Sequence, residues 1–195
     1  MSRITRLAVL VVGLMSLFGI MSATAGAVTW HNTGSTNFTA TTGPGTLSST
    51  NSALSCTGGS ATGDAPTGST VGTTYLVRGT VTFSGCVLAG ITLGVDCGYT
   101  LTGTTQPAAG QTTGTVDLTC GLYSFGAEIC HLAGNAHGIY TNGNPGTLTI
   151  TTGGNIITSN PASGSCVLGN GDRAHLSELT FRTTSASPPS ITRTA

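Results

Sequence analysis

Six cysteines and four histidines are the side chains of this 195-residue sequence with the most obvious chemistry. They are Cys56, Cys86, Cys97, Cys120, Cys130 and Cys166, with His31, His131, His137 and His175. A metal site is one possibility, because His131 and His137 follow Cys130 closely and Glu128 lies in the same stretch. Zinc sites usually carry Cys-x-x-Cys or His-Glu-x-x-His spacing, which the sequence lacks. We therefore expect no metal ligands and no cofactor, and turn or surface positions for the histidines.

Hydrolytic catalysis is a second possibility, with Glu128, His131 and His137 as acid–base candidates in a loop-rich stretch after Cys120. The sequence has no Gly-x-Ser-x-Gly turn to present a serine nucleophile. Asp96 and Asp117 fall on the polar side of alternating segments, where carboxylates are usually solvated. The sequence therefore predicts no catalytic residues, and a small secreted hydrolase using the first three residues is the alternative.

Carbohydrate binding is a third possibility, because exposed aromatic rings stack on sugars. Tyr75 and Tyr99 follow the parity of buried residues, which leaves Trp30, Tyr123 and Tyr140 as candidate contacts. A carbohydrate-binding module using these three rings is a further alternative.

Two alternating segments position the central cysteines. Apolar residues recur at every second position from Ile91 to Leu101 and from Val116 to Leu122, which is the period of a strand with one buried face. If the segments form a hairpin about a loop at residues 104–113, pairing Leu101 with Val116 brings Cys97 opposite Cys120. A one-residue slip would set apolar against polar side chains throughout. The register thus predicts a disulfide, with two buried thiols as the alternative.

The other four cysteines allow three pairings among themselves. We favour Cys56 with Cys86 and Cys130 with Cys166, because each pair joins neighbours in chain order. The sequence leaves the other pairings open.

The remaining pattern indicates short strands joined by turns. Strands are expected at residues 37–41, 46–56 and 75–83, with a turn-rich stretch at 58–72 and a last strand carrying Leu176, Leu179 and Phe181. Residues 147–158 are expected to form a hairpin that turns at Gly153-Gly154. About eight to ten strands without helical periodicity predict an all-β fold, an antiparallel β-sandwich or barrel braced by disulfides.

The first residues have the pattern of a secretory signal. Arg3 and Arg6 precede an apolar run at residues 7–20, and small residues follow at 22–27. The run is shorter than the roughly 20 residues of a membrane anchor. We expect a signal peptide at 1–27, one β-rich domain at 28–184 and a Ser/Thr/Pro-rich tail at 185–195. Export places the cysteines in an oxidising compartment.

Charge narrows the choice of partners. After cleavage four arginines and no lysine face six acids, a net charge of −2 with neutral histidines. Such a chain cannot neutralise a phosphate backbone, which argues against nucleic acid and anionic membranes. We expect a secreted, extracellular or surface-associated domain with a structural or binding role, whose partner is a cell-surface component or glycan.

Two segments carry a resemblance. Residues 169–177 (GNGDRAHLS) followed by 189–192 (PSIT), and residues 83–86 (FSGC) before a long alternating strand, resemble uncharacterised small secreted Thr/Gly-rich β-proteins of high-GC Gram-positive bacteria. The resemblance implies export, a bacterial source and β-architecture, and it transfers no active site.

Overall fold

The computed structural model describes residues 28–50, 52–71, 75–159, 166, 168–169 and 171–194. All regular elements in these residues are β-strands, which confirms the all-β prediction. The strands are β1 (Thr29–Asn32), β2 (Asn37–Thr42), β3 (Gly45–Ser48), β4 (Ala53–Cys56), β5 (Gly58–Asp64), β6 (Gly68–Val71), β7 (Val77–Leu88), β8 (Ile91–Ala108), β9 (Gln111–Ser124), β10 (Ala127–Thr141), β11 (Thr147–Ser159), β12 (Arg173–Leu176), β13 (Leu179–Thr183) and β14 (Ile191–Thr194). The predicted signal peptide lies outside the described residues.

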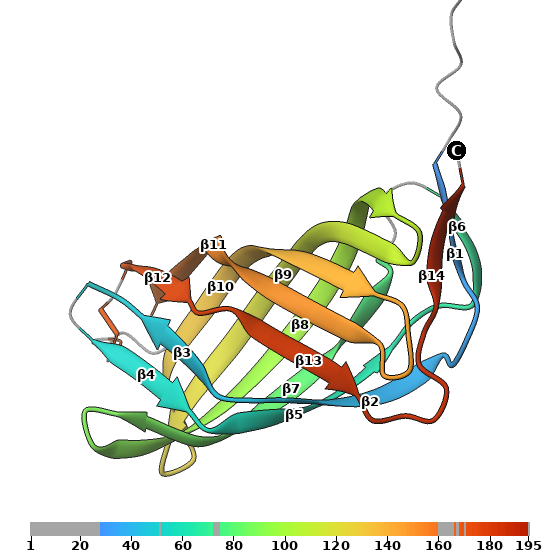
Figure 1. Ribbon diagram of the computed structural model, residues 1–195. Helices are drawn as coiled ribbons and strands as arrows, with labels where there is room; N and C mark the ends of the chain where they lie inside the picture. Colours follow the sequence, from blue (N-terminus) through green and yellow to red (C-terminus); the bar gives the residue numbers. More distant parts are fainter. Residues whose placement is uncertain are drawn as a thin grey trace, which may run out of the picture.

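Antiparallel pairing closes most of these strands into a barrel (Figure 1). Strands β7 to β11 pair in chain order. From β11 back to β7 the wall is made of short strands: β12, β3 and β4 in one part, and β13, β2 and β5 in the other. The ring therefore has eight positions. Five are the long strands β7 to β11, and each of the other three is shared by two short strands: β12 with β13, β3 with β2, and β4 with β5. A barrel of that size is filled by side chains or holds one small ligand.

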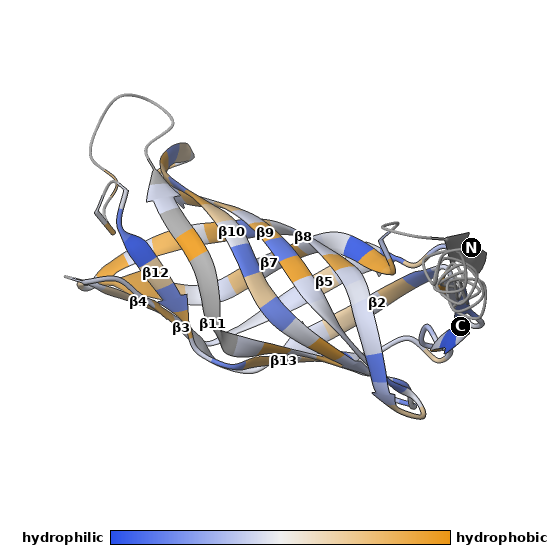
Figure 2. Cartoon of the chain, turned by 90° about the horizontal axis from the view of Figure 1, so that it is seen from above, coloured by the Kyte–Doolittle hydropathy of each residue, from blue (hydrophilic) through white to orange (hydrophobic). Residues whose placement is uncertain are grey.

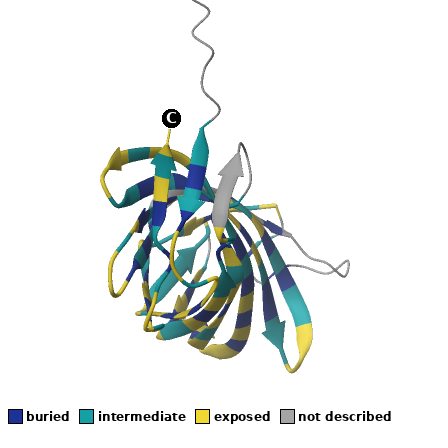
Figure 3. Cartoon of the chain, turned by 90° about the vertical axis from the view of Figure 1, so that its right-hand side faces the viewer, coloured by how far each residue is buried: buried dark blue, intermediate teal, exposed yellow. Residues whose placement is uncertain are grey.

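Side-chain alternation decides which face of the wall is enclosed. On β8, Leu93, Val95, Cys97, Tyr99 and Leu101 are buried, whereas the residues between them are exposed or half-buried. The same alternation runs along the other long strands as bands of hydropathy (Figure 2) and burial (Figure 3). Because successive side chains point to opposite faces of a strand, the apolar set lines the interior and threonines cover the outside.

The hairpin of β8 and β9 has the register that the sequence predicts. Leu101 is the partner of Val116, and Cys97 is the partner of Cys120 at a Cα–Cα distance of 4.0 Å. The structure contains the disulfides Cys97–Cys120, Cys56–Cys86 and Cys130–Cys166, the pairing favoured from the sequence. Cys56–Cys86 joins β4 to β7, and Cys130–Cys166 joins β10 to the segment before β12.

A second, three-stranded sheet of order β14-β1-β6 covers one end of the barrel (Figure 1). It buries Trp30 and Ile191, which are 2% and 1% exposed. The indole of Trp30 packs against Gly103 of β8, at a place where a β-carbon would lie 2.7 Å from the ring. Residues 191–194 of the expected Ser/Thr/Pro-rich tail form β14 of this sheet. Ile191 is the only large aliphatic residue of that segment, so its sequence has no alternation that would predict a strand.

Several predicted turns are strands. Gly153 and Gly154 do not turn the chain but lie within β11, in an irregular step between the pairs Thr151–His137 and Asn155–Asn135. The expected turn-rich stretch at 58–72 contains β5 and β6, and the expected loop at 104–113 is mostly strand, with a turn at residues 109–110. The expected last strand is split into β12 and β13. Pairing with neighbouring strands overrides the local preference of glycine and serine for turns in these segments.

Candidate functional site

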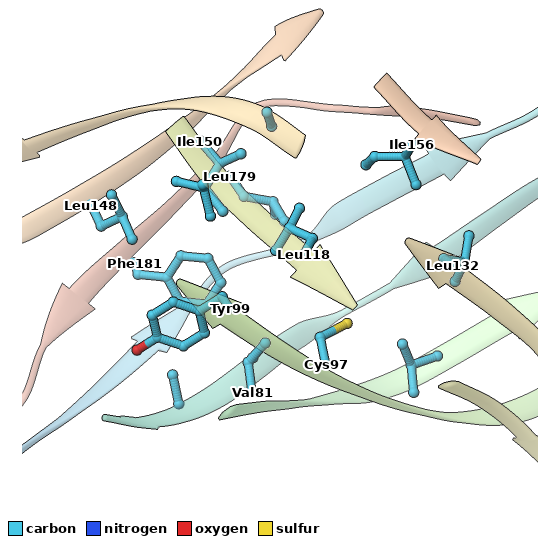
Figure 4. Close-up of a cluster of buried hydrophobic side chains, with 14 of the residues drawn as sticks. Val81, Cys97, Tyr99, Leu118, Leu132, Leu148, Ile150, Ile156, Leu179 and Phe181 are labelled. Atoms are coloured by element: carbon cyan, nitrogen blue, oxygen red, sulfur yellow. The ribbon is translucent and has the colours of Figure 1, made fainter. Parts of the chain in front are cut away.

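The barrel interior is apolar and incompletely filled. A cavity of about 80 Å³ lies inside the ring, and every strand of the ring contributes to its lining. Val81, Leu118, Leu132, Ile150 and Phe181 project into this space from five different strands (Figure 4). An engineered apolar cavity of about 150 Å³ binds benzene or xenon, so this space suits a slender apolar group or a rare-gas atom.

At one level of the barrel wall, the two central residues of a row of cross-strand partners are glycines. Phe38 of β2 is the partner of Gly63 of β5, Gly63 is the partner of Gly79 of β7, and Gly79 is the partner of Tyr99 of β8. The two aromatic rings cover the two glycines from inside: a β-carbon on Gly63 would lie 2.5 Å from Phe38 Cζ and 2.8 Å from Tyr99 Oη. We call this set the glycine rung. At this level only backbone and two aromatic rings form the wall.

Tyr99 places a hydroxyl group in the largely apolar interior. Its ring stacks on Phe181 at a centroid distance of 6.5 Å (Figure 4). Burial, followed by the nearby Asp64 carboxylate, raises the pKa of Tyr99, so the hydroxyl stays protonated at neutral pH. Thr46, Tyr140 and Thr183 also line the interior space, so Tyr99 is one of four hydroxyl-bearing residues there.

On its outer side, the glycine rung borders an open depression between β2, β5 and β7. Its lining includes Asn37, Thr39, Thr62, Thr80 and Ser185, as well as Phe38, Gly63, Asp64 and Gly79. Phe38 lines both this depression and the interior cavity.

A polar cluster lies at the edge of the depression. Arg78 Nε is 3.0 Å from Asp64 Oδ1, and the Tyr75 hydroxyl donates to Asp64 Oδ2 at 3.1 Å. The guanidinium of Arg78 also lies 4.4 Å from the centre of the Tyr75 ring. Tyr75 is therefore half-buried in a surface cluster, and its predicted place in the core is wrong. It lies just before β7, where the alternation of the strand does not yet apply.

The structure separates the three hydrolase candidates. Glu128 Oε1 lies 3.0 Å from His131 Nδ1, and both side chains are partly exposed. His137 lies six residues further along β10, about 20 Å away at the rise of a strand. The expected loop-rich stretch is thus largely a strand, and it brings together two of the three residues.

The outer surface beside His131 holds groups that the sequence analysis missed. Gly121 of β9 lies between His131 and Asp96, its partners on β10 and β8. A β-carbon on Gly121 would lie 2.6 Å from the hydroxyl of Tyr123, so that hydroxyl occupies the gap. The predicted register of β8 and β9 already contained the pair Asp96–Gly121, whereas the register of β10 could not be predicted. Asp117 is exposed on the outer face and lies opposite Thr100, as the register predicts.

Two of the three rings proposed to bind sugars are inaccessible. Trp30 is buried beneath the end sheet, and Tyr140 is 3% exposed, with its hydroxyl donating to the carbonyl of Pro189 at 2.6 Å. Burial raises the pKa of Tyr140 to about 12. Tyr123 is half-buried and lies over Gly121. The expectation of a sugar-stacking surface made by these three rings is therefore wrong.

The described part of the chain holds neither a metal-binding cluster nor a membrane-spanning helix. Within it, no cluster of three or more His, Cys, Asp and Glu side chains is arranged to hold a metal ion. The same residues contain no helix long and apolar enough to cross a membrane.

No protein-family model matches the chain, and neither a curated protein nor a solved structure matches it. What the chain does has therefore to be inferred from its own residues.

Proposed function

We propose that this chain is an exported, non-catalytic binding protein that holds a small apolar ligand inside its barrel. The observation that carries the proposal is the unfilled space at the centre of the ring, enclosed by apolar side chains from every strand. This apolar lining suits an apolar guest. This assigns a site to the binding role expected from the sequence.

The energetics of the cavity support a binding role. An empty apolar space costs about 24 cal/mol per Å³, so 80 Å³ costs about 2 kcal/mol. Slightly larger side chains at Val81 or Ala61 would reduce that cost. A ligand that fills the space recovers part of it, because it restores the missing van der Waals contacts.

Export is supported by two independent features. The pattern of residues 1–27 is that of a signal peptide. All six cysteines are joined in disulfides, which persist in oxidising compartments. The proposal includes a location outside the cell, either at its surface or free. It also includes kinship with secreted bacterial β-proteins. A glycan or another cell-surface component as partner would have to bind the polar outer face.

Xenon binding tests the interior site. Ile150 lines the cavity, whereas Ile91 is 57% exposed, so the same substitution at the two positions gives a matched pair. We expect xenon to shift the methyl NMR signals of Leu118 and Ile150 in the native protein and in Ile91→Phe. Ile150→Phe fills the cavity and should abolish the shifts that Leu118 shows. If no methyl signal inside the barrel responds to xenon, the proposal fails.

The pair Glu128–His131 favours a second candidate, a small secreted hydrolase. A carboxylate within 3.0 Å of a ring nitrogen orients a histidine for proton transfer. The Tyr123 hydroxyl and Asp96 lie on the same outer face. The exposed position of the pair is against this candidate, because water is not excluded there.

A further inference from the structure

The outer face of β8, β9 and β10 carries an aromatic side chain that lies along the sheet. Tyr123 is two residues from Gly121 on β9, so both belong to the same side of the strand. A β-carbon on Gly121 would lie 2.6 Å from Tyr123 Oη and 2.8 Å from Cε2 and Cζ, so the phenol end is folded back over the glycine. Tyr123 is half-buried. The ring therefore forms a small platform on the surface of the barrel.

A β-bulge brings an acid and a base to this platform. Residues three apart in a regular strand point to opposite faces, but the pairing of β10 with β9 shifts between Glu128 and Cys130. Glu128 is the partner of Tyr123 and His131 is the partner of Gly121, so both side chains reach the outer face. There Glu128 Oε1 lies 3.0 Å from His131 Nδ1. Bulges are enriched where a side chain is re-aimed towards a functional site.

Asp96 bounds the platform on its other side. It is exposed on β8, is the partner of Gly121, and accepts a hydrogen bond from the Thr82 hydroxyl through Oδ1 at 2.7 Å. Neighbouring strands lie about 4.8 Å apart, so the backbones of Asp96 and His131 lie about 10 Å from each other. One hexopyranose ring with its hydroxyl groups bridges such a width. We call the set Asp96, Gly121, Tyr123, Glu128 and His131 the tyrosine platform.

We propose that the tyrosine platform binds one neutral hexopyranose unit of a glycan. The C–H face of the sugar would lie on the Tyr123 ring, and its hydroxyl groups would bind the flanking side chains. This site is on the outer face of the wall and is independent of the interior cavity, so it goes beyond the proposed function. It uses one of the three rings expected from the sequence, with polar partners that the register of β8, β9 and β10 supplies.

The mixture of polar groups determines the ligand class. The carboxylates of Asp96 and Glu128 accept hydrogen bonds, whereas the Tyr123 hydroxyl also donates one. A sugar hydroxyl both donates and accepts, so one pyranose can pair with all of these groups. A quaternary ammonium ion forms no hydrogen bonds, and its usual sites are cages of several aromatic rings. A plain aromatic ligand would stack on the ring but would leave the carboxylates without a donor.

The first experiment is an NMR titration with methyl β-D-glucopyranoside and methyl β-D-galactopyranoside. We expect at least one of the two to shift the ring signals of Tyr123 and His131. Asp96→Ala should weaken this binding about 3- to 10-fold, the range for one hydrogen bond. Asp117→Ala removes an exposed carboxylate from the same face, further along β9, and should leave the binding unchanged.

Three outcomes of this titration would overturn the inference. They are the absence of shifts with both glycosides, equal affinities in the two alanine variants, and tighter binding of tetramethylammonium than of either glycoside. The xenon experiment reads the interior separately, so the proposed function stands in each case.

The second experiment tests the ring as the binding surface. Gly121→Ala places a methyl group where the phenol end of Tyr123 lies, and the ring can swing away because it ends a flexible side chain. Gly94→Ala is the matched control: Gly94 is the partner of Tyr123 on β8, and a β-carbon there would have its nearest neighbour at 3.6 Å. We expect glycoside binding to fall about 10-fold in Gly121→Ala and to stay native in Gly94→Ala.

Tyr123→Leu removes the ring without touching either glycine. It should lose glycoside binding as Gly121→Ala does, with a circular dichroism spectrum like that of the native protein. If Tyr123→Leu binds the glycosides as tightly as the native protein, the ring only covers the glycine backbone and the tyrosine platform is not a sugar site.

Discussion

The hydroxyl of Tyr99 lies 2.8 Å from the position that a β-carbon on Gly79 would occupy. The ring and the glycine are cross-strand partners on β8 and β7, so the aromatic side chain lies over backbone that carries no side chain of its own. Such pairing of an aromatic ring with a glycine supports a strand that glycine alone would weaken. It also holds the Tyr99 hydroxyl in position at the glycine rung.

The first prediction concerns the space inside the glycine rung. Gly63→Ala would place a methyl group within 3 Å of Phe38 Cζ, Arg78 O and Tyr99 Oη, and one of these contacts is backbone. We expect a loss of about 1–3 kcal/mol in the free energy of unfolding, as for an overpacked core. Urea unfolding monitored by circular dichroism measures it.

Gly98 supplies the control for this substitution. It also lies within a strand of the ring, but a β-carbon there would have its nearest neighbour at 3.9 Å. Gly98→Ala should leave the urea midpoint nearly unchanged or raise it slightly. If both variants lose the same stability, the cost belongs to glycine replacement in general and the close packing of the rung is refuted.

The second prediction concerns the disulfide within the β8–β9 hairpin. Cys97 and Cys120 are 23 residues apart in the sequence. Replacing both by alanine should lower the free energy of unfolding by about 3 kcal/mol, mainly because the unfolded chain regains freedom. Peptide mapping without reduction should recover the three pairs of the structure. Peptides that join Cys97 to Cys56 or Cys86 would contradict the register of the barrel.

The third prediction concerns alkaline pH. Burial raises the pKa of Tyr140 to about 12 from 10.0, so the unfolded chain loses this proton at a lower pH than the folded one. The contribution of Tyr140 to stability is therefore complete below pH 10 and is lost as the pH rises through about 12. The urea midpoint should fall across that interval.

Tyr140→Phe isolates this effect. The variant lacks the ionisable group, so its urea midpoint should fall less between pH 10 and 12 than that of the native protein. At neutral pH it should be less stable by about 1 kcal/mol, because the carbonyl of Pro189 loses its donor. An alkaline loss equal to that of the native protein would assign the effect to other groups.

The fourth prediction concerns the end sheet. Trp30 is the single tryptophan of the chain and is 2% exposed, so its fluorescence reports on this sheet alone. Deleting residues 185–195 removes β14 with the buried Ile191 and should shift the emission to longer wavelength and increase quenching by acrylamide. Thr192→Ala, a change at an exposed position of β14, should leave both unchanged. A deletion variant with native emission would show that β14 does not cover the indole.

The fifth prediction separates the binding protein from the hydrolase. Alanine at Glu128 or His131 removes the surface pair. Because we assign no catalysis to this pair, we expect both variants to hydrolyse ester, glycan and peptide substrates at the same background rate as the native protein. Stability should change by at most about 1 kcal/mol, as for an exposed ion pair. Activity that disappears in both variants and persists in His137→Ala would establish the second candidate instead.

The sequence predicted the parts of the fold in which alternation is long and unbroken. From Ile91 to Leu101 and from Val116 to Leu122 the parity alone determined the register and the Cys97–Cys120 disulfide. The turn predicted at Gly153-Gly154 was wrong. β11 pairs with β10 on both sides of these glycines, and this pairing keeps the chain extended through them. Closure of the barrel could not be predicted, since it depends on pairs far apart in sequence such as Ala40 with Thr183.

The candidate site was hidden from the sequence for a related reason. Phe38, Gly63, Gly79 and Tyr99 come from four strands, and no spacing in the chain relates them. Only the register of three successive strand pairs brings them to one level. The cavity depends on how the volumes of many side chains add up inside the ring, and no single residue type in the sequence indicates it.

Three strand pairs join the first strands of the domain to the last. β1 pairs with β14, β2 with β13 and β3 with β12. Nearly the whole polypeptide must therefore be synthesised before the barrel can close. If the chain crosses a membrane unfolded, the barrel and its interior form only on the far side. Any guest molecule captured at that moment would come from the surroundings in which the protein works.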